Sequence, residues 1–124
     1  MAVPVLKQGD VLIASVQAEL ADADLINLRD DLVARVGRFR SRRVIVDVTV
    51  LDVMDSFAVR TLRSIAHMTK LRGAETVIVG IQPDVAFAMV QLGLTLEGIQ
   101  TALDLEEGLA LLEAGAPGDI GSVR

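Results

Sequence analysis

Several residue types are missing or scarce in this sequence of 124 residues, and each absence narrows its chemistry. The chain contains no cysteine, tryptophan or tyrosine and only three phenylalanines. Without cysteine there are no disulfides and no thiol chemistry, which is consistent with a cytoplasmic protein. With so few aromatic rings, stacking on nucleobases or sugars is not expected.

Long apolar runs and a secretory signal are also absent. No stretch approaches the roughly 18 apolar residues that cross a bilayer, and residues 1–7 lack the basic-then-apolar order of a signal peptide. Basic residues are also fewer than acidic ones. The chain has 12 Lys and Arg against 17 Asp and Glu, which gives a net charge of −5. This balance disfavours general nucleic-acid binding. We therefore expect a cytoplasmic protein with no membrane or nucleic-acid partner.

Apolar residues, in contrast, are in excess. They make up 52% of the chain before its ten glycines are counted, and roughly 60% with them, against about 45–50% in an average protein. Large apolar patches are uncommon on monomers, so we expect an assembly, at least a dimer or other homo-oligomer. The length fits one domain that buries a core without metal or disulfides.

The hydrophobic pattern predicts an opening hairpin followed by further strands. Gly9-Asp10 lies between two β-rich runs, which is typical of a tight hairpin turn. The unbroken apolar run at residues 44–46 indicates a strand buried on both faces. The predicted strands cover residues 3–8, 11–17, 43–48 and 76–80, with a short extended piece near residue 99.

Helices alternate with these strands. Asp22 or Asp24 is expected to cap the first helix, and Asp104 the last. The spacing of three and four predicts one buried face on the first helix, made of Leu25, Leu28, Leu32, Val36 and Phe39. The second helix is expected over residues 56–72 and the third from Pro83. The order predicts an α/β fold with a small mixed sheet and about four packing helices, followed by a flexible tail over residues 115–124.

The most informative stretch follows the third predicted strand. A loop with Asp52 and Asp55 ends at Ser56, where an amphipathic helix begins. We expect the Ser56 hydroxyl to be exposed at the positive end of the helix dipole, where a phosphate would gain free N–H groups and a favourable field. Ser and Asp at a helix start are also ordinary caps. From the residues alone, a helix cap and a phosphorylation site stay equal alternatives.

Asp47, Asp52 and Asp55 also raise the possibility of a magnesium site at the end of a central strand. A response-regulator receiver domain has such a site, but it needs a carboxylate pair after its first strand and a lysine after its last. No lysine follows Lys70 here. The favoured interpretation is that the loop aspartates bond locally and Asp55 caps the helix. We expect no metal site and no cofactor.

The single histidine, His67, falls in a basic stripe with Arg60, Arg63 and Lys70. Ser56 lies about 16 Å away along the same predicted helix, so a serine–histidine catalytic pair is not expected, and we predict no enzyme activity. A second basic segment either ends the first helix in solvent or forms a docking patch for an acidic partner; it contains Arg35, Arg38, Arg40, Arg42 and Arg43.

Residues 45–49 followed by residues 52–57 resemble the phosphorylation-site loop of STAS domains, the anti-sigma-factor antagonists and their relatives. The order of predicted elements is similar too. Four further stretches resemble the RsbS subfamily: residues 12–17, 68–74, 80–83 and 101–109. The resemblance covers about residues 4–112. It implies a STAS domain over residues 1–114, with residues 115–124 as the tail.

The resemblance implies a non-enzymatic component of a stressosome. Such a protein would co-assemble with RsbR-type STAS proteins and capture an RsbT-type serine/threonine kinase. The kinase would bind a surface containing Asp52, Asp55, Ser56 and Phe57 and would leave once Ser56 is phosphorylated. An RsbX-type phosphatase would reset the switch. Two alternatives stay open: a stand-alone anti-sigma-factor antagonist that binds an anti-sigma kinase, and a small phosphotransfer or hydrolytic enzyme that uses the aspartates.

Overall fold

Residues 3–114 are described by the computed structural model of this chain. The predicted tail, residues 115–124, lies outside the described residues. Strands and helices alternate after an opening pair of strands. The elements are β1 (Val5–Gln8), β2 (Val11–Ser15), α1 (Asp22–Phe39), β3 (Arg43–Asp47), α2 (Ser56–Leu71), β4 (Glu75–Val79), α3 (Pro83–Gln91), β5 (Gln100–Ala102) and α4 (Leu105–Ala114).

The strands form one five-stranded mixed sheet in the order β1-β2-β3-β4-β5. β1 pairs antiparallel with β2 through a turn at Gly9, whose φ of 63° suits glycine. The other neighbours pair in parallel, with Val46 aligned to Ala14 on one side and to Ile78 on the other. The parallel strands therefore end at a common edge. The predicted hairpin and mixed sheet are confirmed.

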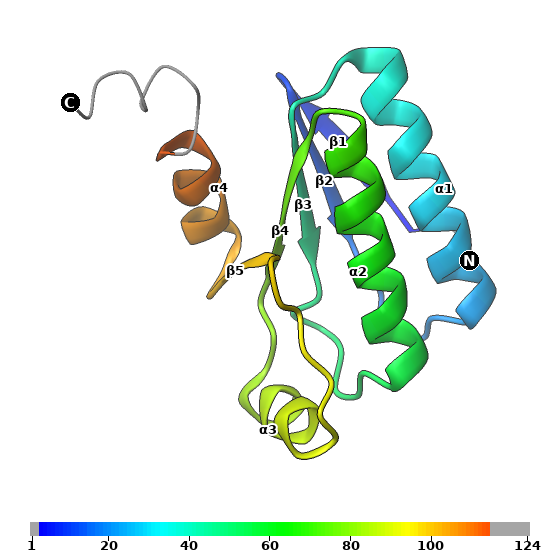
Figure 1. Ribbon diagram of the computed structural model, residues 1–124, viewed down its shortest axis with the longest axis vertical. Coiled ribbons are helices and arrows are strands. Elements are labelled where there is room, and N and C mark those ends of the chain that lie inside the picture. The colour runs from blue at the N-terminus through cyan, green and yellow to red at the C-terminus, as the bar shows by residue number, and fades with distance from the viewer. Residues whose placement is uncertain (1–2, 115–124) are drawn as a thin grey trace.

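Helices cover the two faces of the sheet unequally (Figure 1). α1 and α2 lie side by side on one face, while α4 packs on the other against β3, β4 and β5. α3 lies beyond the carboxyl ends of the parallel strands, close to the loop that enters α2. Within residues 3–114, no helix has both the length and the apolar character needed to span a bilayer.

β3 contributes to a separate apolar core on each face of the sheet. Val44 and Val46 point into the larger core under α1 and α2, together with Leu32 and Leu62. Ile45 points into the smaller core under α4. Each fully buried large aliphatic side chain stabilises the fold by about 1.5–3 kcal/mol. The predicted two-sided burial of residues 44–46 is confirmed.

Two details of α1 differ from the prediction. Its N-cap is Ala21, and Asp24 accepts a hydrogen bond from the Ala21 N–H at 3.0 Å. The predicted capping by Asp22 or Asp24 is wrong, because Asp24 at the third helical position reaches back to the cap, which is half of a capping box. Phe39 is 38% exposed rather than buried; its ring carries the Arg38 guanidinium 4.8 Å from the centroid. At α4, the predicted cap is confirmed, since Asp104 Oδ1 accepts from Glu107 N–H at 2.8 Å.

Candidate functional site

The β3–α2 loop, residues 48–55, lies at the carboxyl edge of the sheet (Figure 1). Asp55 is the N-cap of α2, and its Oδ1 accepts from the Ala58 N–H at 2.8 Å. Ser56 is the first helical residue and is exposed. Within residues 3–114 its hydroxyl makes no hydrogen bond. Asp55 is therefore the helix cap, and the Ser56 hydroxyl is exposed without a hydrogen-bond partner among the described residues.

The start of α2 can accept negative charge at this hydroxyl. The N–H groups of Ser56 and Phe57 belong to the first turn, where backbone donors have no partner inside the helix. The dipole of a helix adds a partial positive charge at the same place. An anionic group on Ser56 would meet these donors without unfolding the helix, while the Asp55 carboxylate would lie next to it.

The surface around Ser56 mixes carboxylates with apolar side chains. Asp52 is exposed and unpaired among the described residues. Val53 is 78% exposed and Val50 is 50% exposed. Phe57 is half-buried and packs against the larger core, so only part of its ring faces solvent. The structure thus brings Asp52, Asp55 and Ser56 to one surface and places Phe57 at its edge.

The beginning of the loop is bound to a neighbouring turn. Asp47 Oδ1 accepts from both the N–H and the hydroxyl of Thr49, at 2.9 and 2.5 Å. From the turn between β4 and α3, the Gln82 side-chain amide donates to the Thr49 carbonyl at 2.7 Å. Thr49 is therefore held from two sides, and through it the loop that leads to Ser56.

Gly80 allows this contact between the two loops. Its φ is 84°, and a Cβ there would lie 3.0 Å from the Thr49 Cα and overlap its hydroxyl oxygen. Only a residue without a side chain lets the turn approach Thr49 so closely. The roles of Gly80, Thr49 and Gln82 were missed from sequence. The Gly-Ile-Gln-Pro run was visible, but the atom that Gln82 reaches depends on the register of β3 and β4.

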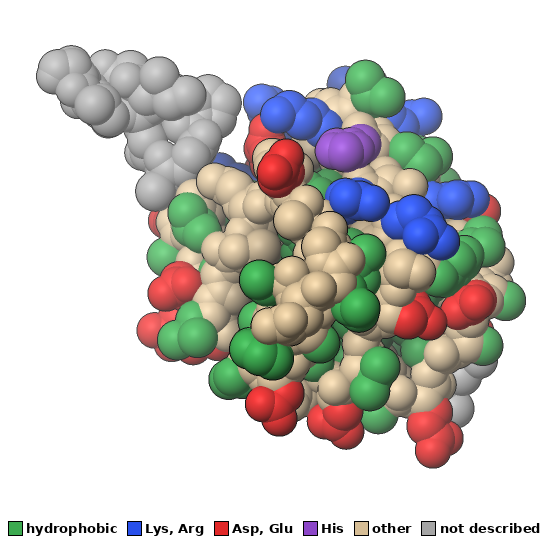
Figure 2. Space-filling view, turned by 60° about the horizontal axis from the view of Figure 1, so that its bottom comes forward, with side chains coloured by type: hydrophobic (Ala, Val, Ile, Leu, Met, Phe, Trp, Pro, Cys, Tyr) green, Lys and Arg blue, Asp and Glu red, His purple; other side chains and the backbone are tan. Residues whose placement is uncertain are grey.

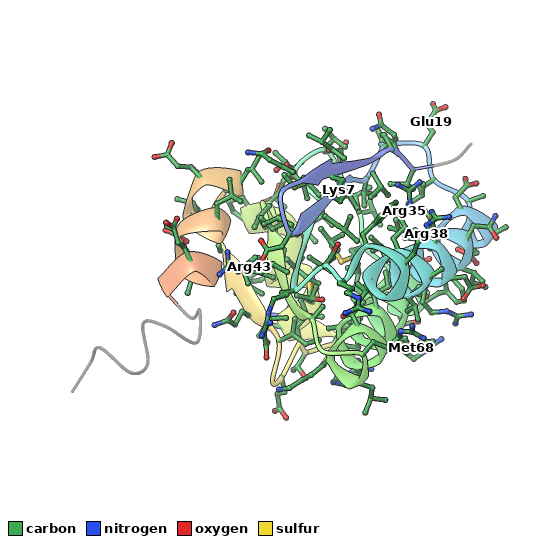
Figure 3. The ribbon with its side chains drawn as sticks, turned by 90° about the horizontal axis from the view of Figure 1, so that it is seen from above. Lys7, Glu19, Arg35, Arg38, Arg43 and Met68 are labelled. Carbon is green, nitrogen blue, oxygen red and sulfur yellow. The ribbon has the colours of Figure 1, made fainter. Side chains whose placement is uncertain are left out.

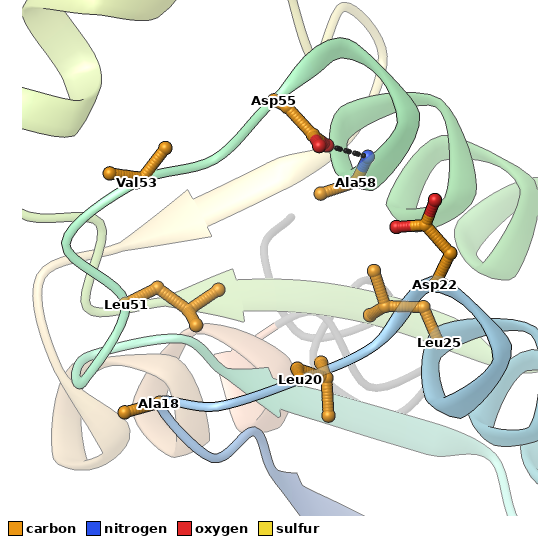
Figure 4. A pocket seen from close by; sticks show the side chains of 8 residues that line it. All are labelled: Ala18, Leu20, Asp22, Leu25, Leu51, Val53, Asp55 and Ala58. Carbon is orange, nitrogen blue, oxygen red and sulfur yellow. Dashed lines mark hydrogen bonds between the residues drawn. The ribbon is translucent and has the colours of Figure 1, made fainter.

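A pocket of about 100 Å³ opens beside the helix cap (Figure 4). Its apolar lining comes from the β2–α1 segment, the start of α1, the β3–α2 loop and the start of α2. Two carboxylates also line it, one at the start of each helix. The lining residues are Ala18, Leu20, Asp22, Leu25, Leu51, Val53, Asp55 and Ala58.

The local bonds predicted for Asp47 and Asp55 are confirmed. Across residues 3–114 no three His, Cys, Asp or Glu residues are grouped to hold a metal ion. His67 is exposed on α2 and is not brought to Ser56. Figure 2 shows the histidine among basic side chains, with acidic side chains toward the lower margin of the same view. Arg63, another member of the predicted basic stripe, donates a hydrogen bond to the Thr95 carbonyl at 3.2 Å.

The arginine-rich segment is partly satisfied within the chain. Arg35 forms an ion pair with Asp31 at 2.9 Å, four residues earlier on α1. Arg43 lies 3.7 Å from Asp10 in the β1–β2 turn. Figure 3 shows Arg35 and Arg38 on α1 and Arg43 toward the side of α4. These residues therefore face different directions, while Arg40 and Arg42 stay exposed.

Comparison with known proteins defines the class. A family model for the STAS domain matches residues 2–108, and the chain therefore belongs to the STAS domain family. A substituted RsbS of Moorella thermoacetica has a similar structure, with a TM-score of 0.78 and 32% identity over 90% of this chain and 94% of that one. A chain from the stressosome, described as a signal integration and transduction hub, also gives 0.78 and 32%, over 92% of this chain and 99% of that one.

Curated relatives come from Bacillus subtilis (strain 168). The RsbT co-antagonist protein RsbRA is 28% identical over 98 residues, which are 79% of this chain and 34% of the relative. The RsbT co-antagonist protein RsbRD is 32% identical over 65 residues, which are 52% and 23%. This chain thus spans about a third or less of their length. The unphosphorylated anti-sigma factor antagonist SpoIIAA, 15% identical with a TM-score of 0.69, shares the fold.

Proposed function

We propose that this chain is a stressosome scaffold and phosphoprotein that holds a switch kinase and releases it when Ser56 is phosphorylated. The observation that carries the proposal is the free, exposed hydroxyl of Ser56 beside a cap that Asp55 supplies. The proposal is also supported by the 32% sequence identity to an RsbS, which covers nearly the whole of both chains. In this role the chain is the substrate of a kinase and needs no cofactor of its own.

Two partners follow from the relatives. The curated relatives are named co-antagonists of RsbT, which supports an RsbT-type kinase as the ligand of the Ser56 surface and RsbR-type STAS proteins as assembly partners. The high apolar content and the exposed valines of the β3–α2 loop agree with surfaces that partners cover. An RsbX-type phosphatase would remove the phosphate, and the cycle would run in the cytoplasm.

The switch acts on affinity rather than on folding. Phosphorylation adds about −1.5 to −2 charges at neutral pH, next to the carboxylates of Asp52 and Asp55. The first turn of α2 tolerates this charge, so the domain keeps its structure. A kinase surface that fits the unmodified loop then meets repulsion, and each 1.4 kcal/mol lost weakens binding about tenfold. Two or three unfavourable charge contacts are enough for release.

Kinase binding before and after phosphorylation tests this proposal. Titration calorimetry with the RsbT-type kinase of the same organism should give tight binding to unmodified chain and to Ser56→Ala. The phosphorylated chain should bind at least tenfold more weakly, and Ser56→Asp should lie between, because a carboxylate carries less charge than a phosphate. Equal affinity of the modified and unmodified chains would contradict the switch.

The stand-alone anti-sigma-factor antagonist differs in assembly. The likeness to SpoIIAA at 15% identity concerns the fold and gives this alternative no weight of its own. Electron microscopy after co-expression with an RsbR-type protein separates the two roles. Discrete large particles that contain both chains support the scaffold, while a chain that stays apart and binds an anti-sigma kinase supports the alternative.

A further inference from the structure

Leu71, the last residue of α2, projects into solvent between two basic residues. Its side chain is 87% exposed, the highest value among the large hydrophobic residues of the described chain. Lys70 has only a long 3.9 Å contact to Glu75 and stays largely exposed. The Arg72 guanidinium lies over Gly37 of α1. Its side chain is thus turned toward α1, leaving Leu71 as an uncovered apolar side chain with positive charge on both sides.

The pocket at the opposite end of α2 has the complementary character. It is about 100 Å³ in volume; Leu20, Leu25 and Leu51 give it an apolar side, and the carboxylates of Asp22 and Asp55 give it a polar side. Apolar cavities of about 150 Å³ bind benzene, so the apolar side of this smaller pocket has room for a single branched aliphatic side chain, with a cation beside it at the carboxylates. Figure 4 shows Asp22 and Asp55 projecting from the starts of the two helices beside it.

These two features cannot meet within one molecule. The pocket lies at the start of α2 and Leu71 at its end, so the length of the helix separates them (Figure 1). A second copy of the chain, however, presents both surfaces. Its α2 end can approach the first copy's pocket with Lys70 and Arg72 facing Asp22 and Asp55.

The charge of the whole domain favours the same approach. The end that carries Leu71 is basic, with Asp10, Glu75 and Glu113 as its acidic residues and with Lys7, Arg38, Arg40, Arg42, Arg43, Lys70 and Arg72 as its basic ones. Figure 3 looks onto this end. The end that holds the pocket is acidic and carries Glu19, Asp22, Asp52, Asp55, Asp84 and Glu97. Opposite potentials at two ends orient approaching copies head to tail.

We propose that this chain associates with itself head to tail, with Leu71 of one copy inserted into the pocket between the α1 and α2 starts of the next. Such an interface is heterologous, so it builds chains or rings rather than a two-fold dimer. A nucleic acid or an anionic membrane fits the basic end less well, because the net charge is −5 and the acidic end would be repelled.

The contact would cover Asp55, next to Ser56, but the proposal does not rest on the proposed kinase switch. It concerns the purified chain without kinase, ATP or any partner. A chain that associates but is never phosphorylated would support this inference and contradict the switch. A monomeric chain phosphorylated on Ser56 would do the reverse.

Sedimentation velocity on the full chain at low and high salt tests the proposal. We expect the sedimentation coefficient of the wild type to rise with concentration and to fall with salt. Leu71→Asp should weaken self-association roughly tenfold or more, since it removes a buried leucine from the contact. Leu92→Asp is the matched control, because Leu92 is also exposed but lies at the end of α3; it should associate like the wild type.

Mixing two variants tests the head-to-tail geometry itself. Val53 is exposed and lines the pocket, so Val53→Lys damages the pocket and keeps Leu71. Each variant alone should stay monomeric, whereas an equimolar mixture should form a dimer and nothing larger, through the one intact contact. Circular dichroism should give wild-type spectra for both. A monomeric wild type, wild-type association by Leu71→Asp, or no dimer in the mixture would overturn the proposal.

Discussion

The two ends of helix α2 are held by contacts of different reach along the sequence. At its C-terminal end, the turn to β4 closes through the backbone, with Gly73 N–H donating to the Lys70 carbonyl and Ala74 N–H to the Thr69 carbonyl, both at 2.9 Å. At its N-terminal end, the β3–α2 loop is held by a backbone bond from Val48 N–H to the Val79 carbonyl at 2.9 Å and by bonds from side chains. Some of these, such as Gln82 bonding to Thr49, come from a distant part of the sequence.

The difference shows how this STAS domain can separate stability from the proposed phosphorylation site. The C-terminal end is fixed by local backbone geometry and by a buried hydrogen bond between Thr69 and Thr76 at 2.8 Å. The N-terminal end combines a firmly capped helix with a free hydroxyl at Ser56. The cap holds the helix start, so a modification of Ser56 can change the surface without changing the fold.

The largest expected effect comes from a pair of glycines, one near each end of α2. Gly80→Ala places a Cβ against the backbone of Thr49, and we expect a loss of about 3 kcal/mol from strain and overlap together. Gly73→Ala also has a positive φ but meets nothing within 4 Å, so it should cost about 1 kcal/mol. Urea unfolding of both variants measures the difference. Equal losses would contradict the close approach of the two loops.

A second pair of variants separates the helix cap, Asp55, from the proposed phosphate acceptor, Ser56. Asp55→Ala removes the side chain that binds the Ala58 N–H and should cost about 1–2 kcal/mol, as N-cap losses do. Ser56→Ala should stay within about 0.5 kcal/mol, because its hydroxyl supports nothing. Thermal unfolding compares the two. If Ser56→Ala were the more damaging change, Ser56 rather than Asp55 would be the cap.

A smaller effect than those of Gly80→Ala and Asp55→Ala is expected for Gln82→Ala, which breaks the bond to the Thr49 carbonyl. One lost hydrogen bond of a half-buried amide should cost about 1 kcal/mol. Amide exchange in the β3–α2 loop should quicken, because the loop loses its tie to the β4–α3 turn. Gln91→Ala, at the exposed end of α3, is the matched control. Unchanged loop exchange in Gln82→Ala would mean that Asp47 alone holds Thr49.

Local patterns predicted the parts of the fold that depend on neighbouring residues. The two-sided burial of residues 44–46, the start of α2 at Ser56 and the cap by Asp104 each follow from a few adjacent side chains. The position of Phe39 did not, because periodicity cannot tell where a helix face runs past the edge of the core. Ala21 was missed as the first cap because it has no capping side chain.

The candidate site likewise has residues that the sequence could predict and contacts that it could not. The sequence indicated Asp52, Asp55 and Ser56, since they adjoin one predicted helix start. The tie from Gln82 to Thr49 and the pocket shared by Asp22 and Asp55 both depend on which strands are neighbours and in what register. Those pairings bring residues together across long stretches of sequence, and single-sequence periodicity does not contain them.

The central claim is that Ser56 accepts a phosphate, and peptide mass spectrometry tests it most directly. The full chain is incubated with ATP and the RsbT-type kinase of the same organism, beside Ser56→Ala and the control Ser15→Ala, which removes an exposed serine at the end of β2. The account predicts one phosphate on Ser56, present in Ser15→Ala and absent in Ser56→Ala. No phosphate, or phosphate only on other residues, would contradict it.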